Sequence, residues 1–237
     1  MSKVIVVFGA GSGLGASVAR RFGREAYRVA LVARRLEPLA LLAGQLAESD
    51  VEAETFTADL TQEADVLDVL AAIQDSLGRI DAIYYAPTTT DAFISATELS
   101  AGAMRPLMDL SFFSLVSVVQ AVLPDMRERG AGAILGAVAG NAVEGLPYMS
   151  GAGIAHGAAR NFLFSLHGEL APEGIHVGLV CISGVIKGSE YHQQVEAGTS
   201  DAPEGLDLPL VDPDEMAETL WQIGTGSGVR EVVYPRQ

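Results

Sequence analysis

Short apolar stretches alternate along this chain with longer stretches that are apolar on one side only. The first kind is typical of strands buried on both faces, and the second of helices packed against a sheet. The pattern predicts strands over residues 3–8, 28–33, 53–57, 80–85, 133–137, 176–182 and 229–234. It predicts helices over residues 14–24, 38–48, 62–77, 101–129 and 149–170, and a last helix that opens at residues 212–215.

Local signals refine several of these elements. Thr61 is expected to cap the third helix, and Asp212, which is followed by a proline, to cap the last one. Pro106 and Pro124 are expected to break the long fourth helix, because proline removes a backbone donor. Residues 187–209 are rich in Gly, Ser, Asp and Pro, so we predict a mobile loop that covers a substrate.

The regular alternation of strand and helix favours an α/β fold with a parallel sheet. No repeat or linker divides the 237 residues, and a sheet covered by helices often reaches this size in one domain. We therefore predict that residues 1–237 form a single Rossmann-like domain, a doubly wound parallel sheet with helices on both faces.

Charge and cysteine content narrow the classes of function. The net charge of -15 argues against a nucleic-acid partner, which requires a basic surface. The one cysteine, Cys181, excludes an internal disulfide and fits a reducing, cytoplasmic location. The sequence shows no targeting segment and no apolar run of roughly twenty residues, so no membrane association is expected. The scattered histidines predict no metal site.

The connection between the first strand and the first helix reads Gly9-Ala-Gly-Ser-Gly-Leu-Gly15. Glycines allow a tight turn and let the backbone approach a pyrophosphate, which then lies at the positive end of the following helix. The strand–loop–helix context favours a nucleotide site over an ordinary turn. The residues expected to bind the nucleotide here are Gly9, Gly11, Ser12, Gly13, Leu14 and Gly15.

The second strand ends in Ala33-Arg34-Arg35, and Arg34 follows Gly15 by nineteen residues. NAD-binding proteins place an acid near this point for the ribose 2′-hydroxyl, whereas an arginine pairs with the 2′-phosphate of NADP. Such a charge-assisted pair contributes about 1.5–3 kcal/mol, a roughly tenfold to hundredfold preference. Arg34, with help from Arg35, therefore predicts NADP. A solvated basic pair without a ligand is the alternative.

The chain resembles the short-chain dehydrogenase/reductase family over nearly its whole length. The spacing of Gly9, Gly13 and Gly15 is one sign of the resemblance. The others are Asp59-Leu60 after the third strand, and Leu166 with Glu169-Leu-Ala-Pro172 before the sixth.

The resemblance also implies cofactor contacts and assembly. It places Asp59 and Leu60 at the border of the adenine, and Ile186 close to the nicotinamide amide. The family's Asn-Asn-Ala-Gly after the fourth strand reads Tyr84-Tyr-Ala-Pro87 here, which puts Ala86 beside the cofactor. Family members commonly assemble through helices around the active site, so a homodimer or homotetramer is expected.

The family's chemistry uses an asparagine, a serine and a Tyr-x-x-x-Lys pair. The tyrosine is the general acid/base, the lysine lowers its pKa, and the serine orients the substrate oxygen. Counting forward from Gly132 and back from Glu169 gives the same register. The positions of asparagine, serine, tyrosine and lysine are then held by Ser111, Ala139, Ala152 and His156. All four are substituted, so the resemblance implies an atypical member.

Tyr148 and His156 are the candidate replacements for the missing acid/base. If the helix starts near Pro147, then Tyr148, Ala152 and His156 share one helical face at i, i+4 and i+8. A second register, with Tyr148 as the family tyrosine, still lacks the lysine and changes the spacing to Glu169 by four residues. A histidine that only packs against its neighbours is the alternative role for His156.

Three functions fit these residues. The first is an NADP-dependent oxidoreductase that acts on a small molecule with a non-standard acid/base. The second is a non-redox enzyme on the same scaffold, such as a cyclase, isomerase or dehydratase. The third is a non-catalytic NADP-binding sensor or scaffold. We favour the first, because hydride transfer itself needs only a well-placed nicotinamide and substrate.

Overall fold

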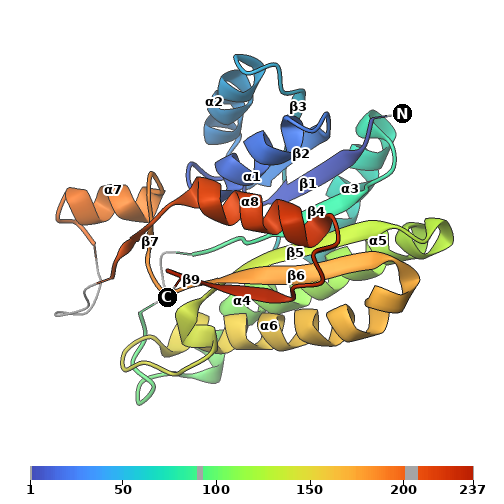
Figure 1. Cartoon of the computed structure of the whole chain (residues 1–237). Coiled ribbons are helices and arrows are strands. Elements are labelled where there is room, and N and C mark those ends of the chain that lie inside the picture. Colours follow the sequence, from blue (N-terminus) through green and yellow to red (C-terminus); the bar gives the residue numbers. More distant parts are fainter. Residues whose placement is uncertain (1, 90–92, 201–207, 237) are drawn as a thin grey trace.

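A seven-stranded parallel sheet forms the centre of the molecule (Figure 1). The computed structural model describes residues 2–89, 93–200 and 208–236. The strand order is β3-β2-β1-β4-β5-β6-β9. These strands are β1 (Val4–Phe8), β2 (Arg28–Ala33), β3 (Ala53–Thr57), β4 (Ala82–Tyr85), β5 (Gly132–Ala139), β6 (Ile175–Ile182) and β9 (Glu231–Tyr234). A separate two-stranded parallel pair joins β7 (Val185–Ile186) to β8 (Leu210–Val211).

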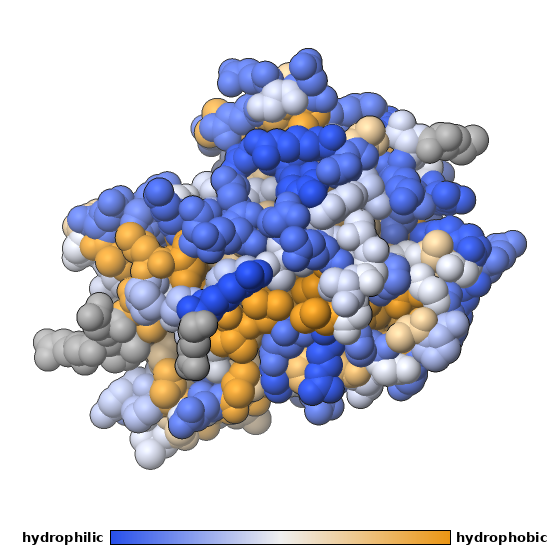
Figure 2. Space-filling view, viewed as in Figure 1, coloured by the Kyte–Doolittle hydropathy of each residue, from blue (hydrophilic) through white to orange (hydrophobic). Residues whose placement is uncertain are grey.

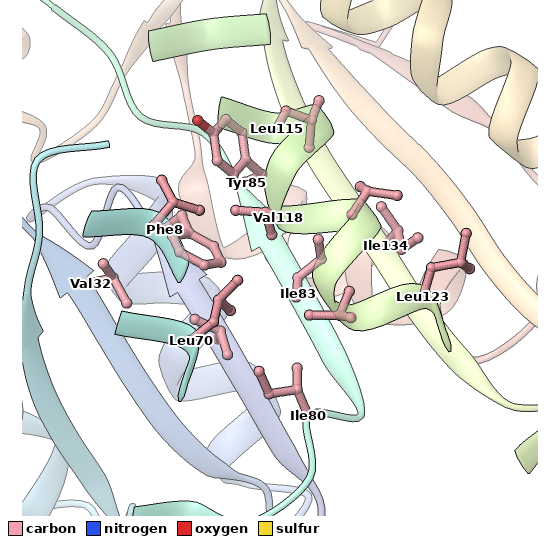
Figure 3. Packing of buried hydrophobic residues seen from close by; sticks show 14 of the residues in the cluster. Phe8, Val32, Leu70, Ile80, Ile83, Tyr85, Leu115, Val118, Leu123 and Ile134 are labelled. Atoms are coloured by element: carbon pink, nitrogen blue, oxygen red, sulfur yellow. The ribbon is translucent and has the colours of Figure 1, made fainter. Parts of the chain in front are cut away.

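Helices cover both faces of the sheet, so the predicted doubly wound fold is confirmed. One face packs against α1 (Leu14–Gly23), α2 (Leu36–Ala47) and α8 (Pro213–Gly224). The other face packs against α3 (Glu63–Leu77), α5 (Ser114–Arg129) and α6 (Ser150–Leu170). Figure 3 shows part of the second layer, where Leu70 of α3 and Val118 of α5 meet Ile83 of β4. The central strands β1 and β4 are apolar throughout because both of their faces are buried, whereas the edge strand β3 is half-buried and carries polar residues.

The long fourth helix is continuous, and the predicted breaks at its prolines are wrong. It consists of α4 (Ala101–Met108), a π-helical turn (Asp109–Phe113) and α5. Pro106 and Pro124 lie inside α4 and α5, where each removes only its own backbone hydrogen bond. The irregularity falls at the π-helical turn, a feature often found at functional sites.

Among the described residues, one helix has the length to span a membrane. Residues Ala101–Arg129 are long and apolar enough to do so by length and composition alone. Leu115, Val118 and Met126 on this helix are buried in the core against the sheet.

Two predicted local features differ in the structure. Thr61 does not cap α3, whose N-cap residue is Gln62; the Thr61 hydroxyl donates to Asp59 instead. The predicted loop over residues 187–209 contains the helix α7 (Glu190–Glu196), because the Ser189 side chain accepts a hydrogen bond from the backbone of His192. The Asp212 cap of α8 is confirmed, since its carboxylate accepts from the backbone of Asp214.

Candidate functional site

The glycine loop lies between β1 and α1, at the carboxyl edge of the sheet. Gly9 has φ +83°, and a Cβ atom there would lie 2.6 Å from the carbonyl oxygen of Ala86. A Cβ on Gly15 would lie 2.7 Å from the Gly9 carbonyl oxygen. Gly11 has open space around it. Gly9 and Gly15 are therefore required by close backbone packing, and Gly11 leaves the surface of the loop free for a ligand.

The strand order explains why this edge is suited to a nucleotide. The chain runs outward from β1 to β2 on one side and continues from β4 to β5 on the other. The connections after β1 and β4 therefore diverge, and in open α/β sheets ligands bind in the crevice at such a switch point. The contact of Gly9 with Ala86, which follows β4, lies at this crevice.

The arginine pair follows β2 directly, on the same edge as the glycine loop. Both side chains are exposed. Arg35 forms an ion pair with Glu190 of α7, with 3.4 Å between its Nη2 and the carboxylate. Within residues 2–89, 93–200 and 208–236, Arg34 has no ion-pair partner. The two arginines predicted from the sequence therefore both lie at this edge. Among the described residues, Arg35 is paired with a carboxylate of the same chain and Arg34 is not paired.

The remaining residues predicted to contact the cofactor lie on neighbouring loops of this edge. Asp59 is fixed by the backbone and hydroxyl of Thr61, which donate to its carboxylate over 3.0 and 2.8 Å. Leu60 is buried in the core. Ser12 is exposed, and Leu14 is buried at the start of α1. Ile186 of β7 lies 3.3 Å from the position of a Cβ on Gly13.

Three of the four residues that the sequence analysis assigned to the family's catalytic positions lie close together at this edge. Ser111 lies in the π-helical turn and His156 on α6, and both line one small cavity with Tyr85 and Ala86. Ala139 ends β5, and its backbone N–H donates to Nδ1 of His156 over 3.2 Å. Ser111 and Ala152 are buried, and Ala139 and His156 are partly buried.

The hydrogen bond to Nδ1 fixes the tautomer of His156. A ring nitrogen that accepts a backbone N–H carries no proton, so the neutral ring carries its proton on Nε2. Burial lowers the pKa of His156 to about 4. The ring is therefore an uncharged hydrogen-bond donor at neutral pH, unlike the lysine that the family places there.

Tyr148 does not lie on the face of α6, which corrects the predicted helical alignment. The helix begins at Ser150, and Tyr148 precedes it with φ +63° and an exposed fraction of 60%. The side chain of Asn141 donates to the Met149 carbonyl over 3.0 Å, which fixes the chain just before the helix. Tyr148 therefore lies on the surface next to the amino end of α6, and only Ala152 and His156 share the helix face.

Two further residues were not singled out as site residues from the sequence. The hydroxyl of Tyr85 donates to the carbonyl of Leu110 in the π-helical turn. Burial raises its pKa, so Tyr85 is a neutral group that ties β4 to the residue before Ser111. The other is Glu190, whose pairing with Arg35 could not be predicted from a local sequence pattern, because the two residues lie far apart in the sequence.

Within the described residues, no group of three or more His, Cys, Asp and Glu side chains could hold a metal ion.

The fold and this edge define a dinucleotide-binding protein of the Rossmann type. The model of the short chain dehydrogenase family matches residues 3–198. The chain therefore belongs to the short-chain dehydrogenase family.

Similar proteins agree with this membership. Sulfoacetaldehyde reductase 2 from Chromohalobacter salexigens is 30% identical over 230 residues, which cover 95% of this chain and 89% of that protein. A variant of the actinorhodin polyketide ketoreductase, solved with NADPH, has a TM-score of 0.84 and 25% identity, covering 98% of this chain and 95% of that one. A short-chain oxidoreductase from Pseudomonas aeruginosa PAO1, whose structure contains an atypical catalytic center, has a TM-score of 0.82 and 21% identity, covering 98% and 95%.

Proposed function

We propose that the protein is an NADP-dependent oxidoreductase that acts on a small molecule through a non-standard acid/base. The observation that carries the proposal is the position of Arg34 and Arg35 directly after β2, beside the glycine loop. Two cations at this point suit the 2′-phosphate of NADP. The ketoreductase with a similar fold binds NADPH, which supports the same choice.

The chain's own residues fit this cofactor along the carboxyl edge of the sheet. NADP supplies or accepts the hydride when it is bound. The backbone of Gly11, Ser12, Gly13 and Leu14 would hold the pyrophosphate at the amino end of α1. Asp59 and Leu60 would border the adenine, and Ala86 and Ile186 the nicotinamide.

The acid/base is the atypical part of the proposal. Ala139 and Ala152 offer only methyl groups where the family has its serine and tyrosine, and Ser111 replaces its asparagine. His156 lines the cavity as a neutral Nε2–H donor, which suits binding of a ribose or substrate oxygen. Tyr148 is the proposed proton donor, from the exposed segment before α6. The P. aeruginosa protein has the same fold and an atypical catalytic center, which supports the proposal that this fold tolerates altered catalytic residues.

The same observations favour a second candidate, a non-catalytic NADP-binding protein. A pKa of about 4 leaves His156 a poor proton donor at neutral pH, and the two alanines have no acid/base at all. This candidate keeps the nucleotide site and loses the chemistry. The non-redox enzyme considered from the sequence has no structural feature of its own in its favour.

Deuterium transfer separates the two candidates. NADPH deuterated at the nicotinamide C4 is incubated with the protein and a panel of aldehydes and ketones, and the products are analysed by mass spectrometry. An oxidoreductase transfers deuterium to a product carbon. A protein that binds NADPH and transfers no deuterium to any member of a broad panel is the non-catalytic candidate.

The lid and the assembly are further parts of the proposal. We propose that residues 187–209, which include α7, form a lid over the substrate; residues 201–207 of this segment lie outside the described part of the structure. We also propose a homodimer or homotetramer in a cytoplasmic setting, which the buried, unpaired Cys181 fits. Val233 on the sheet-edge strand β9 is 48% exposed, and Figure 2 shows hydrophobic residues gathered on the surface over β6 and β9. Light scattering after gel filtration tests the assembly, and a monomeric mass would contradict it.

A further inference from the structure

The helix α7 lies against the nucleotide edge and contacts it at three places. A Cβ on Gly13 would lie 3.0 Å from the Cβ of Ser189, the residue that caps α7. Glu190 pairs with Arg35. The ring of Tyr191 lies 6.2 Å from that of Phe93, on the segment after β4. Three consecutive residues thus bind α7 to the glycine loop, to the arginine pair and to the far side of the crevice.

The base of this segment is also fixed. Val185 and Ile186 in β7 pair with Leu210 and Val211 in β8. The carbonyl oxygen of Pro209 would lie 2.6 Å from a Cβ on Gly184, so the backbone segments that lead into β7 and β8 are in contact. The contacts of α7 with the nucleotide edge are therefore made by a segment whose start and end are held together.

The Glu190 carboxylate pairs with Arg35, one of the two arginines proposed to bind the 2′-phosphate. Arg35 and Glu190 are 70% and 65% exposed, and their atoms are 3.4 Å apart. An exposed pair of this kind is weak, so an incoming dianion can replace the carboxylate. While the pair is formed, however, the arginine is partly neutralised, and the phosphate binds less tightly than it would to two free arginines.

We infer that Glu190 competes with the 2′-phosphate of NADP for Arg35, and so limits the preference of this protein for NADP over NAD. The inference rests on the proposed NADP cofactor. NAD carries no 2′-phosphate, so its binding does not require Arg35 to leave Glu190. Glu190 is on this account a specificity-determining residue, and binding of NADP releases the contact that holds α7 to the arginine pair.

The test is a titration of NADPH and NADH against the wild-type protein, Glu190→Gln and Arg35→Ala. Glu196→Gln is the matched control, because it removes the same charge from the same helix, where the carboxylate lies 3.9 Å from His192 rather than beside Arg35. We expect Glu190→Gln to tighten NADPH about twofold to fivefold and to leave NADH unchanged. Arg35→Ala should weaken NADPH, and adding Glu190→Gln to it should produce no further change. The gain should shrink at 1 M salt, where exposed charges are screened.

Each outcome of this titration decides the matter. If the wild-type protein prefers NADPH and Glu190→Gln leaves that preference unchanged, the inference is wrong and the proposed cofactor stands. Equal tightening by Glu196→Gln would assign the effect to net charge and would also overturn the inference. If the wild-type protein does not distinguish NADPH from NADH, the proposed cofactor itself is wrong, and the inference falls with it.

Discussion

The backbone N–H of Ala139 donates to Nδ1 of His156, so the end of β5 and the second turn of α6 are joined through a neutral imidazole. In a typical short-chain dehydrogenase these two positions carry a serine and a lysine, as implied by the resemblance. Here one contributes only its backbone and the other an uncharged ring. The charge that would lower the pKa of a neighbouring acid is therefore absent from this position, which is the physical basis of the non-standard chemistry that we propose.

The depressed pKa of His156 predicts a loss of stability as the pH falls. An unfolded histidine binds a proton below its ordinary pKa of 6.5, whereas the folded one stays neutral down to about 4. The unfolded state thus takes up more protons between these values, and stability is lost as the pH falls through this window. We expect the contribution of His156 to decrease by about 2 kcal/mol between pH 7 and pH 5.

Urea unfolding of the wild-type protein and His156→Gln at several pH values measures this contribution. The difference between the two proteins at pH 8, where both are neutral at residue 156, reports packing alone and is the control. The prediction is that the wild-type protein loses more stability than the variant between pH 7 and pH 5. Parallel pH profiles would show that His156 titrates normally in the folded protein.

The strands and the glycine loop could be predicted from sequence because they depend on local patterns. The strand predicted over residues 28–33 coincides with β2, whose inner residues are buried and apolar without interruption. The strand predicted over residues 53–57 coincides with the half-buried edge strand β3. The helix predicted over residues 149–170 matches α6 to within one residue. The position of Tyr148 outside this helix could not be predicted, because Asn141 fixes Met149 through a side-chain contact eight residues away. The pairing of Arg35 with Glu190 spans 155 residues and depends on the whole fold. The glycine loop could therefore be predicted from the sequence, whereas the side-chain contacts around Tyr148 and His156 could not.

Two glycines of the same loop should differ sharply in their tolerance of alanine. Gly9→Ala places a methyl group 2.6 Å from the Ala86 carbonyl oxygen at a positive φ, and we expect a loss of about 2–4 kcal/mol. Gly11→Ala is the matched control, because nothing lies within 4 Å of its Cβ position. Its stability should change by less than about 0.5 kcal/mol. Denaturant midpoints measure both, and equal losses would contradict the packing described for this loop.

Removal of the proposed acid/base groups should lower the rate and spare the cofactor. Once a substrate is known, Tyr148→Phe and His156→Ala should each reduce turnover about tenfold or more, with NADPH affinity little changed. Tyr27→Phe is a control, because Tyr27 precedes β2 at the opposite edge of the sheet and packs against Phe22 and Trp221. If His156→Ala lowers only thermal stability and leaves the rate per folded molecule intact, the histidine has a packing role.

Ordinary carbonyl reductase activity should be absent or very low. No Tyr-x-x-x-Lys pair is present at the family positions, and loss of one positioned acid/base typically costs about 10²–10⁴ in rate. NADPH oxidation with generic ketones, followed by absorbance, should therefore show little turnover. Turnover on the order of 10 s⁻¹ would mean that the assignment of Ala152 and His156 to the tyrosine and lysine positions is wrong.

The cofactor claim is tested most directly by the ratio of NADPH to NADH dissociation constants in the wild-type protein and in Arg34→Ala. Arg24→Ala is the matched control, because Arg24 is an exposed arginine at the other end of α1. We predict that the wild-type protein prefers NADPH by roughly tenfold to hundredfold, that Arg34→Ala removes most of this preference, and that Arg24→Ala retains it. Equal affinities for the two nucleotides in the wild-type protein, or an unchanged ratio in Arg34→Ala, would contradict the account.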